Sequence, residues 1–306
     1  MNKKCFRANG KLLLTAEYLV LDHAKAIALP TKLGQTLEVE MLKDQFIIWE
    51  SFLPQQQKWN SATFKISSQT IEIESEKNEF SLQLQQILQV LLDAKPILFR
   101  EKGYHFTTHL EFDKNWGLGS SSTLIYNLAT WANINPYLLL EKTFGGSGYD
   151  IACAGIDQPI FYQRNGIQPK IEVTEFRPNF SDQLFFVYLN QKKNSREAIK
   201  HYQQLDARTK QEAITKINRI SEEVLSPVLA LSEFENLITQ HEIILSEVLE
   251  LPTIKQQLFS DYPKAIKSLG AWGGDFILAT GNQEQQSYFI KKGYHTVIPF
   301  KEMILL

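Results

Sequence analysis

The chain has 306 residues, 43% of them hydrophobic and 22% charged, and a formal net charge of −2. This composition is typical of a globular protein long enough for two domains, and the near balance of charge argues against a nucleic-acid binder or a membrane-surface protein. No stretch approaches the ~20 apolar residues of a membrane span or contains the apolar segment of a signal peptide, which predicts a soluble cytoplasmic protein. The two cysteines, Cys5 and Cys153, lack metal-ligand spacing, so we expect buried free thiols.

The first third of the chain is predicted to form mostly strands, because β-branched and aromatic residues stand between turn formers. The predicted strands are residues 33–41, 46–52, 62–67 and 104–112, and residues 81–94 are predicted to form a helix with apolar residues at 84, 87, 88, 91 and 92. On strand 104–112, His105 and His109 share the face opposite Phe106 and Leu110. A structural or solvated role for the two histidines is therefore favoured over a metal pair.

The rest of the chain alternates before it becomes mainly helical. Helices are predicted after residues 122 and 136, and strands at 159–163, 171–176 and 184–189. A capping-box spacing at Asn194 and Glu197 opens a helical region, in which one long helix ends before Pro227 and another ends near residue 250. A strand at 276–279, a helix at 284–291 and a strand at 296–298 follow. The change in character predicts domains of residues 1–185 and 186–306.

The most informative segment is Gly-Leu-Gly-Ser-Ser-Ser at residues 117–122, between a predicted strand and a predicted helix. Glycines allow a tight turn close to a ligand, and the free N–H groups of the helix start bind anions. Three hydroxyls there can bind phosphate oxygens or Mg²⁺. A well-capped helix is the alternative interpretation. No Walker A loop and no dinucleotide-binding fingerprint occurs in the sequence.

Three further segments carry candidate chemistry. Lys11 stands at the start of a predicted buried strand that leads to Glu17, although a surface lysine and a strand-end carboxylate are the simpler interpretations. Residues 145–152 form a glycine loop that brings Asp150 to the start of a helix, where an N-cap is the alternative. Residues 270–275 form another glycine loop, suited to a ligand or to a tight turn.

Taken together, the four segments resemble the GHMP kinases, named for galactokinase and for homoserine, mevalonate and phosphomevalonate kinases. Residues 9–17 are similar to the family's first motif, residues 117–122 to its second, ATP-phosphate motif, and residues 270–275 to its third. Residues 147–150 look like the segment with the catalytic aspartate. The resemblance covers nearly the whole chain and leans toward the mevalonate and phosphomevalonate kinases.

The resemblance implies an ATP- and Mg²⁺-dependent phosphotransferase that holds the nucleotide and aims a small-molecule acceptor. It implies that Asp150 takes the acceptor's proton, that Lys11 stabilises the transferring group, and that Glu17 holds Lys11 or the acceptor. Metal binding is implied for Ser121 and, if the loop before Asp150 is shorter than in mevalonate kinases, for Glu141. The implied nucleotide-binding residues are Trp116, Gly117, Leu118, Gly119, Ser120, Ser121, Ser122, Gly273 and Gly274.

The sequence departs from the family pattern at two motifs. Asp113 and Asn115 replace the proline and first glycine of a Pro-x-Gly-x-Gly sequence, which affects how the loop meets the nucleotide. Trp272 replaces a glycine of the third motif, where its ring could narrow the site or stack on a ligand. The charges of Lys192, Lys193 and Arg196 suggest an anion site for a phosphorylated acceptor, with a solvated basic turn as the alternative.

The implied fold is α+β: an amino-terminal domain like domain 2 of ribosomal protein S5, and a ferredoxin-like carboxyl-terminal domain. Mevalonate or phosphomevalonate is the expected acceptor, and a monomer or homodimer is the expected assembly. A homoserine or sugar kinase, a decarboxylating relative and a non-catalytic nucleotide-binding regulator remain alternatives. Homoserine kinases typically lack the catalytic aspartate, so the segment around Asp150 argues against that alternative.

Overall fold

The computed structural model describes residues 3–191, 196–270, 272 and 274–306. The chain forms two compact units that are interleaved along the sequence. Unit 1 comprises Met1–Gly10, Leu33–Lys114 and Leu118–Gly155, and unit 2 comprises Lys11–Lys32, Asn115–Gly117 and Ile156–Leu306. The division into domains 1–185 and 186–306 concerns contiguous segments and stays a prediction.

Unit 1 is a sheet with helices on one face. Its strands follow the order β5-β4-β3-β6-β2, with β1 paired to β2. Strand β3 runs parallel to β6, whereas the pairs β2–β6, β3–β4 and β4–β5 are antiparallel. The strands are β1 (Lys4–Leu13), β2 (Ala26–Leu42), β3 (Phe46–Leu53), β4 (Gln57–Ile66), β5 (Ile71–Ile73) and β6 (Gly103–Leu110). The helices are α1 (Glu79–Ala94), α2 (Pro96–Phe99), α3 (Ser120–Ala132), α4 (Pro136–Thr143) and α5 (Tyr149–Ala154), with a 3₁₀ turn at Pro54–Gln56.

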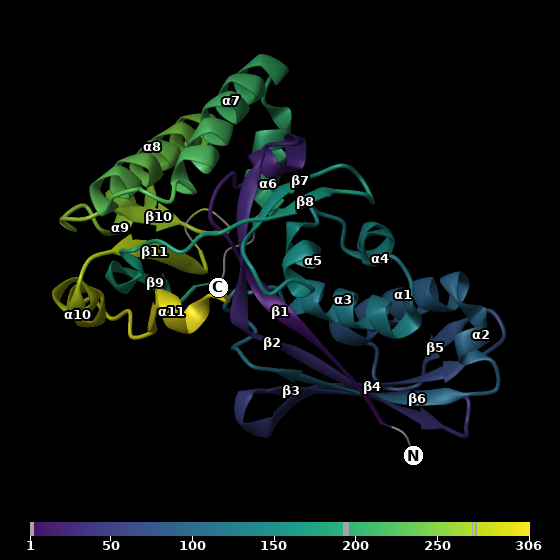
Figure 1. The fold of residues 1–306 in the computed structure, drawn as a ribbon. Coiled ribbons are helices and arrows are strands. Elements are labelled where there is room, and N and C mark those ends of the chain that lie inside the picture. Colours follow the sequence, from purple (N-terminus) through teal and green to yellow (C-terminus); the bar gives the residue numbers. More distant parts are fainter. Residues whose placement is uncertain (1–2, 192–195, 271, 273) are drawn as a thin grey trace. The chain divides into compact units, whose positions relative to one another are not determined.

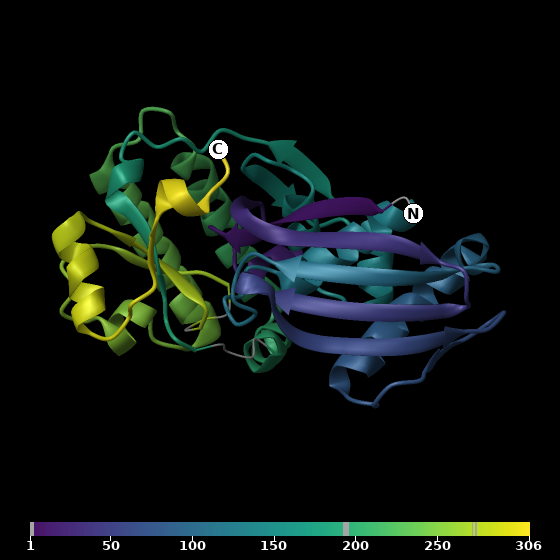
Figure 2. The ribbon, with the colours of Figure 1, turned by 90° about the horizontal axis from the view of Figure 1, so that it is seen from below.

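The core of unit 1 lies between the sheet and its helices (Figures 1 and 2). Trp49 and Phe106 meet on the covered face with ring centroids 5.0 Å apart, and both are fully buried. The predicted stripe of α1 is confirmed, because all five of its apolar residues are buried in this core. On the other face, His105 Nε2 lies 2.9 Å from a Glu50 carboxylate oxygen, and His109 Nε2 lies 3.6 Å from one of Glu38.

Unit 2 contains a four-stranded antiparallel sheet in the order β10-β11-β9-β12, and residues 26–28 of β2 pair with β7, which pairs with β8. The strands are β7 (Ile160–Gln163), β8 (Lys170–Val173), β9 (Leu184–Tyr188), β10 (Ile266–Ser268), β11 (Phe276–Thr280) and β12 (Val297–Pro299). The helices are α6 (Arg196–Gln204), α7 (Ala207–Val224), α8 (Leu231–Leu249), α9 (Ile254–Leu258), α10 (Gln283–Lys291) and α11 (Phe300–Met303), with 3₁₀ turns at Leu19–Asp22 and Ser181–Gln183. Helices α7 and α8 lie side by side (Figure 1).

Most predicted elements are confirmed to within a few residues, and two expectations are wrong. Lys11 lies near the end of β1 rather than at the start of a strand, because Asn9 and Gly10 continue the strand instead of turning. Cys5 is exposed, whereas Cys153 is buried as expected. Cys5 is exposed because it lies at the start of β1, where residues 4 and 5 are both exposed. The capping box at Asn194 and Glu197 lies outside the described residues.

In the described part of the chain, no helix combines the length and the apolar character that crossing a bilayer requires.

Helix α1 offers a test of the unit 1 core. Leu88 is fully buried there, whereas Leu82 on the same helix is 52% exposed. We expect Leu88→Ala to lower the free energy of unfolding by about 2–5 kcal/mol, because it removes buried methyl groups and leaves a cavity. Leu82→Ala is the matched control, with an expected change within about 0.5 kcal/mol. Urea unfolding of both variants checks this, and equal losses would contradict the assigned core.

Candidate functional site

Helix α3 begins at a glycine turn, as the sequence predicts. Gly119 is its N-cap with φ of 94°, and no side chain caps the helix. The carbonyl oxygen of Gly119 accepts the Thr123 N–H at 3.0 Å and the Ser122 hydroxyl at 2.9 Å, while Leu118 is fully buried. The buried Ser122 side chain therefore stabilises the turn through its bond to Gly119. The first N–H groups of the helix retain the positive potential that binds anions.

Ser120 and Ser121 line a cavity of about 90 Å³ in unit 1 that opens to solvent. The cavity is lined mainly by apolar and neutral polar side chains: Gln35, Ser51, Trp59, Phe80, Gln83, Leu84, Ile87, Thr108, Leu110, Ser120, Ser121, Leu124 and Phe144.

Trp59 is the most informative residue of this cavity. Its buried indole Nε1–H has no hydrogen-bond acceptor within the described residues. Buried indole N–H groups usually have a partner, so an acceptor on a ligand would complete this site. The Lys114 ammonium lies 5.0 Å from the centroid of the Trp59 ring and adds positive charge at the same place.

Three predicted segments meet in unit 2 around Gly117. The Lys11 ammonium donates a hydrogen bond of 2.8 Å to the Gly117 carbonyl oxygen. Gly117 has φ of 65°, and a Cβ atom built on it would lie 2.2 Å from Asp275 Oδ2. The glycine is therefore required for both its conformation and the close approach of Asp275. The first, second and third motif-like segments each contribute one residue to this contact.

Two tryptophans support the segments that meet at Gly117. The Trp116 ring packs edge-to-face on Phe276, with centroids 5.5 Å apart. Trp272 is only 4% exposed, and its indole Nε1 donates to the Pro252 carbonyl oxygen at 3.0 Å. The ring that replaces a motif glycine is thus packed into unit 2 and bonded to its backbone.

Asp150 lies in the first turn of α5, with Gly148 rather than Asp150 as the N-cap. Its Oδ1 accepts the N–H of Ile151 at 3.0 Å, and the residue is partly exposed. Helix α5 packs on α3, because Gly155 lies so close to the Tyr126 ring that a Cβ atom would be 2.1 Å from the hydroxyl. Glu141 is exposed on α4. Unit 1 thus contains Asp150, Glu141 and the serines of α3.

Glu17 is buried, with its side chain 2% exposed, and bonds to the Lys267 ammonium in unit 2. The predicted catalytic role of Glu17, to hold Lys11 or the acceptor, stays a prediction. Gly273, Lys192 and Lys193 lie outside the described residues, as does the side chain of Arg196. Among the described residues, no group of three or more His, Cys, Asp and Glu side chains could hold a metal ion.

Sequence reasoning missed Trp59, Lys267 and His241. The histidine had a signal, because it lies three residues after Ile238 and four before Leu245, on the buried stripe of α8. Lys267 had no such signal, since it stands in a three-residue strand in which every residue is buried. Trp59 is on a partly exposed stretch of β4, and only the cavity that it lines marks it as a candidate site residue.

No protein-family model matches the chain, and no curated protein matches its sequence. Solved structures do match its fold. Mevalonate kinase of Methanococcus jannaschii superposes with a TM-score of 0.70 at 15% identity, over 100% of this chain and 99% of that one. Galactokinase of Lactococcus lactis, complexed with galactose, gives 0.68 at 14% identity, over 100% and 95% of the two chains.

A third match is phosphomevalonate kinase of Streptococcus pneumoniae in complex with phosphomevalonate and AMPPNP. Its TM-score is 0.62 at 15% identity, over 99% of this chain and 98% of that one. The chain therefore has the mixed α/β fold of these kinases, which belong to the family that the four sequence segments resemble. At such low identities the likeness concerns the fold, and a common fold can carry different functions.

Gly117 and Gly145 form a matched pair for testing the site. Their φ angles are 65° and 66°, but a Cβ atom would meet Asp275 only at Gly117 and nothing within 4 Å at Gly145. We expect Gly145→Ala to cost about 1 kcal/mol of stability through its backbone conformation alone. Gly117→Ala should cost a further ~1–3 kcal/mol through the clash. Thermal unfolding checks this, and equal costs would contradict the close contact.

Proposed function

We propose that the chain is a GHMP-family kinase that transfers the γ-phosphoryl group of ATP to a small-molecule acceptor, mevalonate or phosphomevalonate. The observation that carries the proposal is the hydrogen bond from the Lys11 ammonium to the carbonyl of Gly117, the glycine against which Asp275 also packs. A cation held on the backbone of a glycine turn that opens a helix is the arrangement expected around transferred phosphates.

The fold supports the same conclusion independently of these contacts. Three kinases of small metabolites match over nearly their whole length. One of them is described in complex with AMPPNP, an ATP analogue. In unit 2, β9, helices α6 to α9, β10, β11, α10 and β12 follow one another, with sheet order β10-β11-β9-β12. This order supports the proposed ferredoxin-like plan, with an S5-like plan for the other domain.

In the proposed complex, α3 binds the ATP phosphates and the unit 1 cavity binds the base. The bare helix start supplies N–H donors, and the apolar lining with the unpaired Trp59 indole N–H suits a flat heteroaromatic ring. The proposed phosphate-loop residues are 116–122, with residues 273 and 274 also contacting nucleotide. Ser122 would act by closing the turn, since its hydroxyl bonds to Gly119.

Mg²⁺ fits the donors present in unit 1. Its preferred ligands are oxygens, and in kinases it takes one or two protein ligands while substrate phosphates and water supply the rest. The Ser121 hydroxyl, exposed at the start of α3, and the exposed Glu141 carboxylate are the proposed ligands. Bound there with ATP, the ion would neutralise phosphate charge.

Asp150 is proposed to accept the acceptor's proton, and Lys11 to stabilise charge on the transferring group. The sequence around Asp150 favours mevalonate or phosphomevalonate, while the galactokinase match keeps a sugar acceptor as a second candidate. A cytoplasmic location and a monomeric or homodimeric state complete the proposal.

The direct test is an ADP-release screen with mevalonate, phosphomevalonate, homoserine and galactose, repeated with Asp150→Asn. We expect acceptor-dependent release from the wild type and a loss of about 10²–10⁴-fold in kcat for the variant, because it lacks the base. The KM for ATP should change little. Asp93→Asn, an exposed carboxylate on α1, is the matched control. ATP binding without acceptor-dependent turnover would favour the non-catalytic regulator.

The cavity allows a separate test of nucleotide binding. Leu124→Trp places an indole ring in the cavity that Leu124 lines, and we expect it to weaken ATP binding by about tenfold or more, equal to ~1.4 kcal/mol. Leu82→Trp on the exposed face of α1 is the control. Calorimetric titration with ATP measures both. Unchanged affinity in Leu124→Trp would show that the base binds elsewhere.

A further inference from the structure

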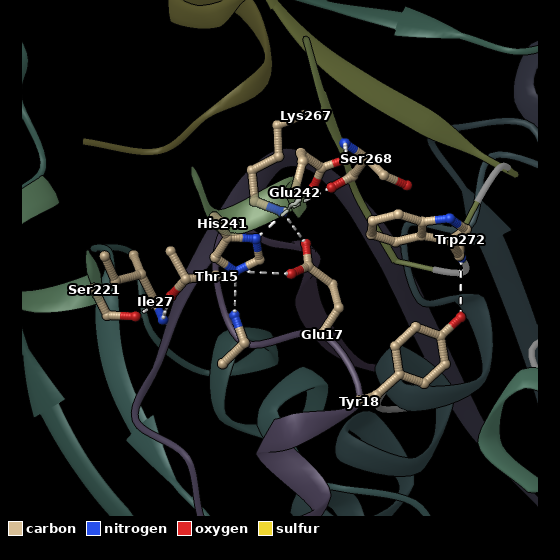
Figure 3. A network of polar contacts seen from close by, with 11 residues as sticks. Thr15, Glu17, Tyr18, Ile27, Ser221, His241, Glu242, Lys267, Ser268 and Trp272 are labelled. Carbon is tan, nitrogen blue, oxygen red and sulfur yellow. Dashed lines mark hydrogen bonds and ion pairs between the residues drawn. The ribbon is translucent and has the colours of Figure 1, made fainter. Parts of the chain in front are cut away.

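Unit 2 contains a small buried network of charged side chains (Figure 3). Glu17 follows β1 in the sequence, and its partners come from α8 and β10. The Lys267 ammonium bonds to Glu17 Oε1, to Glu242 Oε1 at 3.3 Å and to the Ser268 carbonyl oxygen at 2.9 Å. All three N–H donors of the lysine are therefore used. Glu242 Oε2 accepts the Ser268 N–H at 3.0 Å, and the side chains of Glu17, Glu242 and Lys267 are each at most 4% exposed.

The network has two carboxyl groups for one ammonium, and burying an unbalanced charge is costly. Burial raises the pKa of the Glu17 carboxyl from 4.5 to about 7, against the opposing effect of Lys267. Burial also raises the pKa of Glu242. A proton held on one carboxyl group would balance the charges, and these shifts favour such a proton.

His241 indicates where this proton lies. Burial lowers the pKa of His241 well below its usual 6.5, so the ring is neutral. Its Nε2 accepts the Ala16 N–H at 3.0 Å, which places the ring proton on Nδ1. Glu17 Oε2 lies 3.4 Å from the same Nε2 and has no hydrogen-bond partner in the described structure. Two acceptors face each other there, and a proton on Glu17 Oε2 removes their repulsion.

Glu17 stands in the middle of a strained turn. Ala16 and Tyr18 on either side have φ of 68° and 63°, in the left-handed region that non-glycine residues rarely adopt. Contacts hold both residues: His241 accepts the Ala16 N–H, and the Tyr18 hydroxyl accepts the Trp272 N–H at 3.0 Å. Figure 3 shows Tyr18 and Trp272 on one side of Glu17 and His241 on the other.

The turn connects to the contacts at Gly117 from two directions. At one end it follows β1, whose last residues include Lys11, the donor to the Gly117 carbonyl oxygen. At the other end Tyr18 holds Trp272, in the same segment as Asp275, which packs against Gly117. Both neighbours of Gly117 therefore depend on how residues 16–18 are held.

We infer that Glu17 is a positioning residue: by bonding to Lys267 it holds the turn at residues 16–18 and thereby sets where Lys11 and Asp275 meet Gly117. In this role Glu17 acts without contacting the substrate. The consequence for turnover rests on the proposed kinase function, whereas the consequence for the turn does not.

Hydrogen exchange at single amides tests the inference without any activity assay. Glu17→Ala removes the acceptor of the Lys267 ammonium, so the Ala16 and Trp272 amides should exchange about tenfold faster or more. Glu222→Ala is the matched control, since Glu222 pairs with Lys25 on the exposed surface of unit 2. It should leave both amides unchanged. Wild-type exchange at both amides in Glu17→Ala would overturn the inference.

A second variant keeps the test decisive if Glu17→Ala does not fold. Tyr18→Phe removes only the hydroxyl that accepts the Trp272 N–H. The Trp272 amide should then exchange faster, while the Ala16 amide, held by His241, should not. No change at Trp272 would show that the turn does not hold the segment that contains Asp275.

The pH dependence of stability provides another readout. Because the pKa of Glu17 is raised on folding, the folded protein binds a proton that the unfolded chain releases between pH 4.5 and about 7. The stability advantage of the wild type over Glu17→Gln should therefore fall as pH rises through this window and stay constant above it. His241 acts with the opposite sign below pH 6.5, but it is present in both proteins and cancels in the difference. A difference independent of pH would contradict the buried proton.

Kinetics separate this inference from the proposed function. In an active kinase, Glu17→Ala should lower kcat together with faster exchange at Ala16 and Trp272. A loss of kcat with wild-type exchange would mean that Glu17 acts directly on the substrate, which overturns the positioning role. If the wild type has no kinase activity, the proposed function fails, and the exchange experiment still decides the role of Glu17.

Discussion

The ammonium of Lys11 lies 2.8 Å from the carbonyl oxygen of Gly117, and the candidate site in unit 2 is built around this hydrogen bond. The glycine contributes a left-handed conformation and the absence of a Cβ atom, so the Asp275 carboxylate approaches it closely. One residue from each of three distant segments thereby meets the others within unit 2. A cation held on the backbone in this way can act on charge close to the turn without a large rearrangement.

Unit 2 also contains a buried network of charged side chains, and removing such groups from water is unfavourable. A lysine, two glutamates and a histidine are almost fully removed from water, and such groups stabilise a fold only when their hydrogen bonds are satisfied. Lys267 meets this condition through its three acceptors. Here the network adjoins two residues in the left-handed region, Ala16 and Tyr18, whose backbone conformation needs support from surrounding contacts.

Unit 1 supplies a different kind of chemistry. Its helix α3 starts without a side-chain cap beside a mostly apolar cavity, so a ligand with both negative charge and a flat apolar part suits the place. A nucleoside triphosphate has both features. Asp150 belongs to the same unit, on the short helix α5 that packs against α3, so the packing of two helices fixes its backbone.

The sequence by itself determined the elements and the residue types of the site. Apolar periodicity predicted α1 and α7, and the glycine pattern at residues 117–119 predicted the turn before α3, because these signals depend on neighbours along the chain. Only the tertiary structure decided the partners. Glu17 bonds to Lys267 and the Trp272 ring turns inward to Pro252, because burial and contacts across 250 and 20 residues of sequence leave no local pattern.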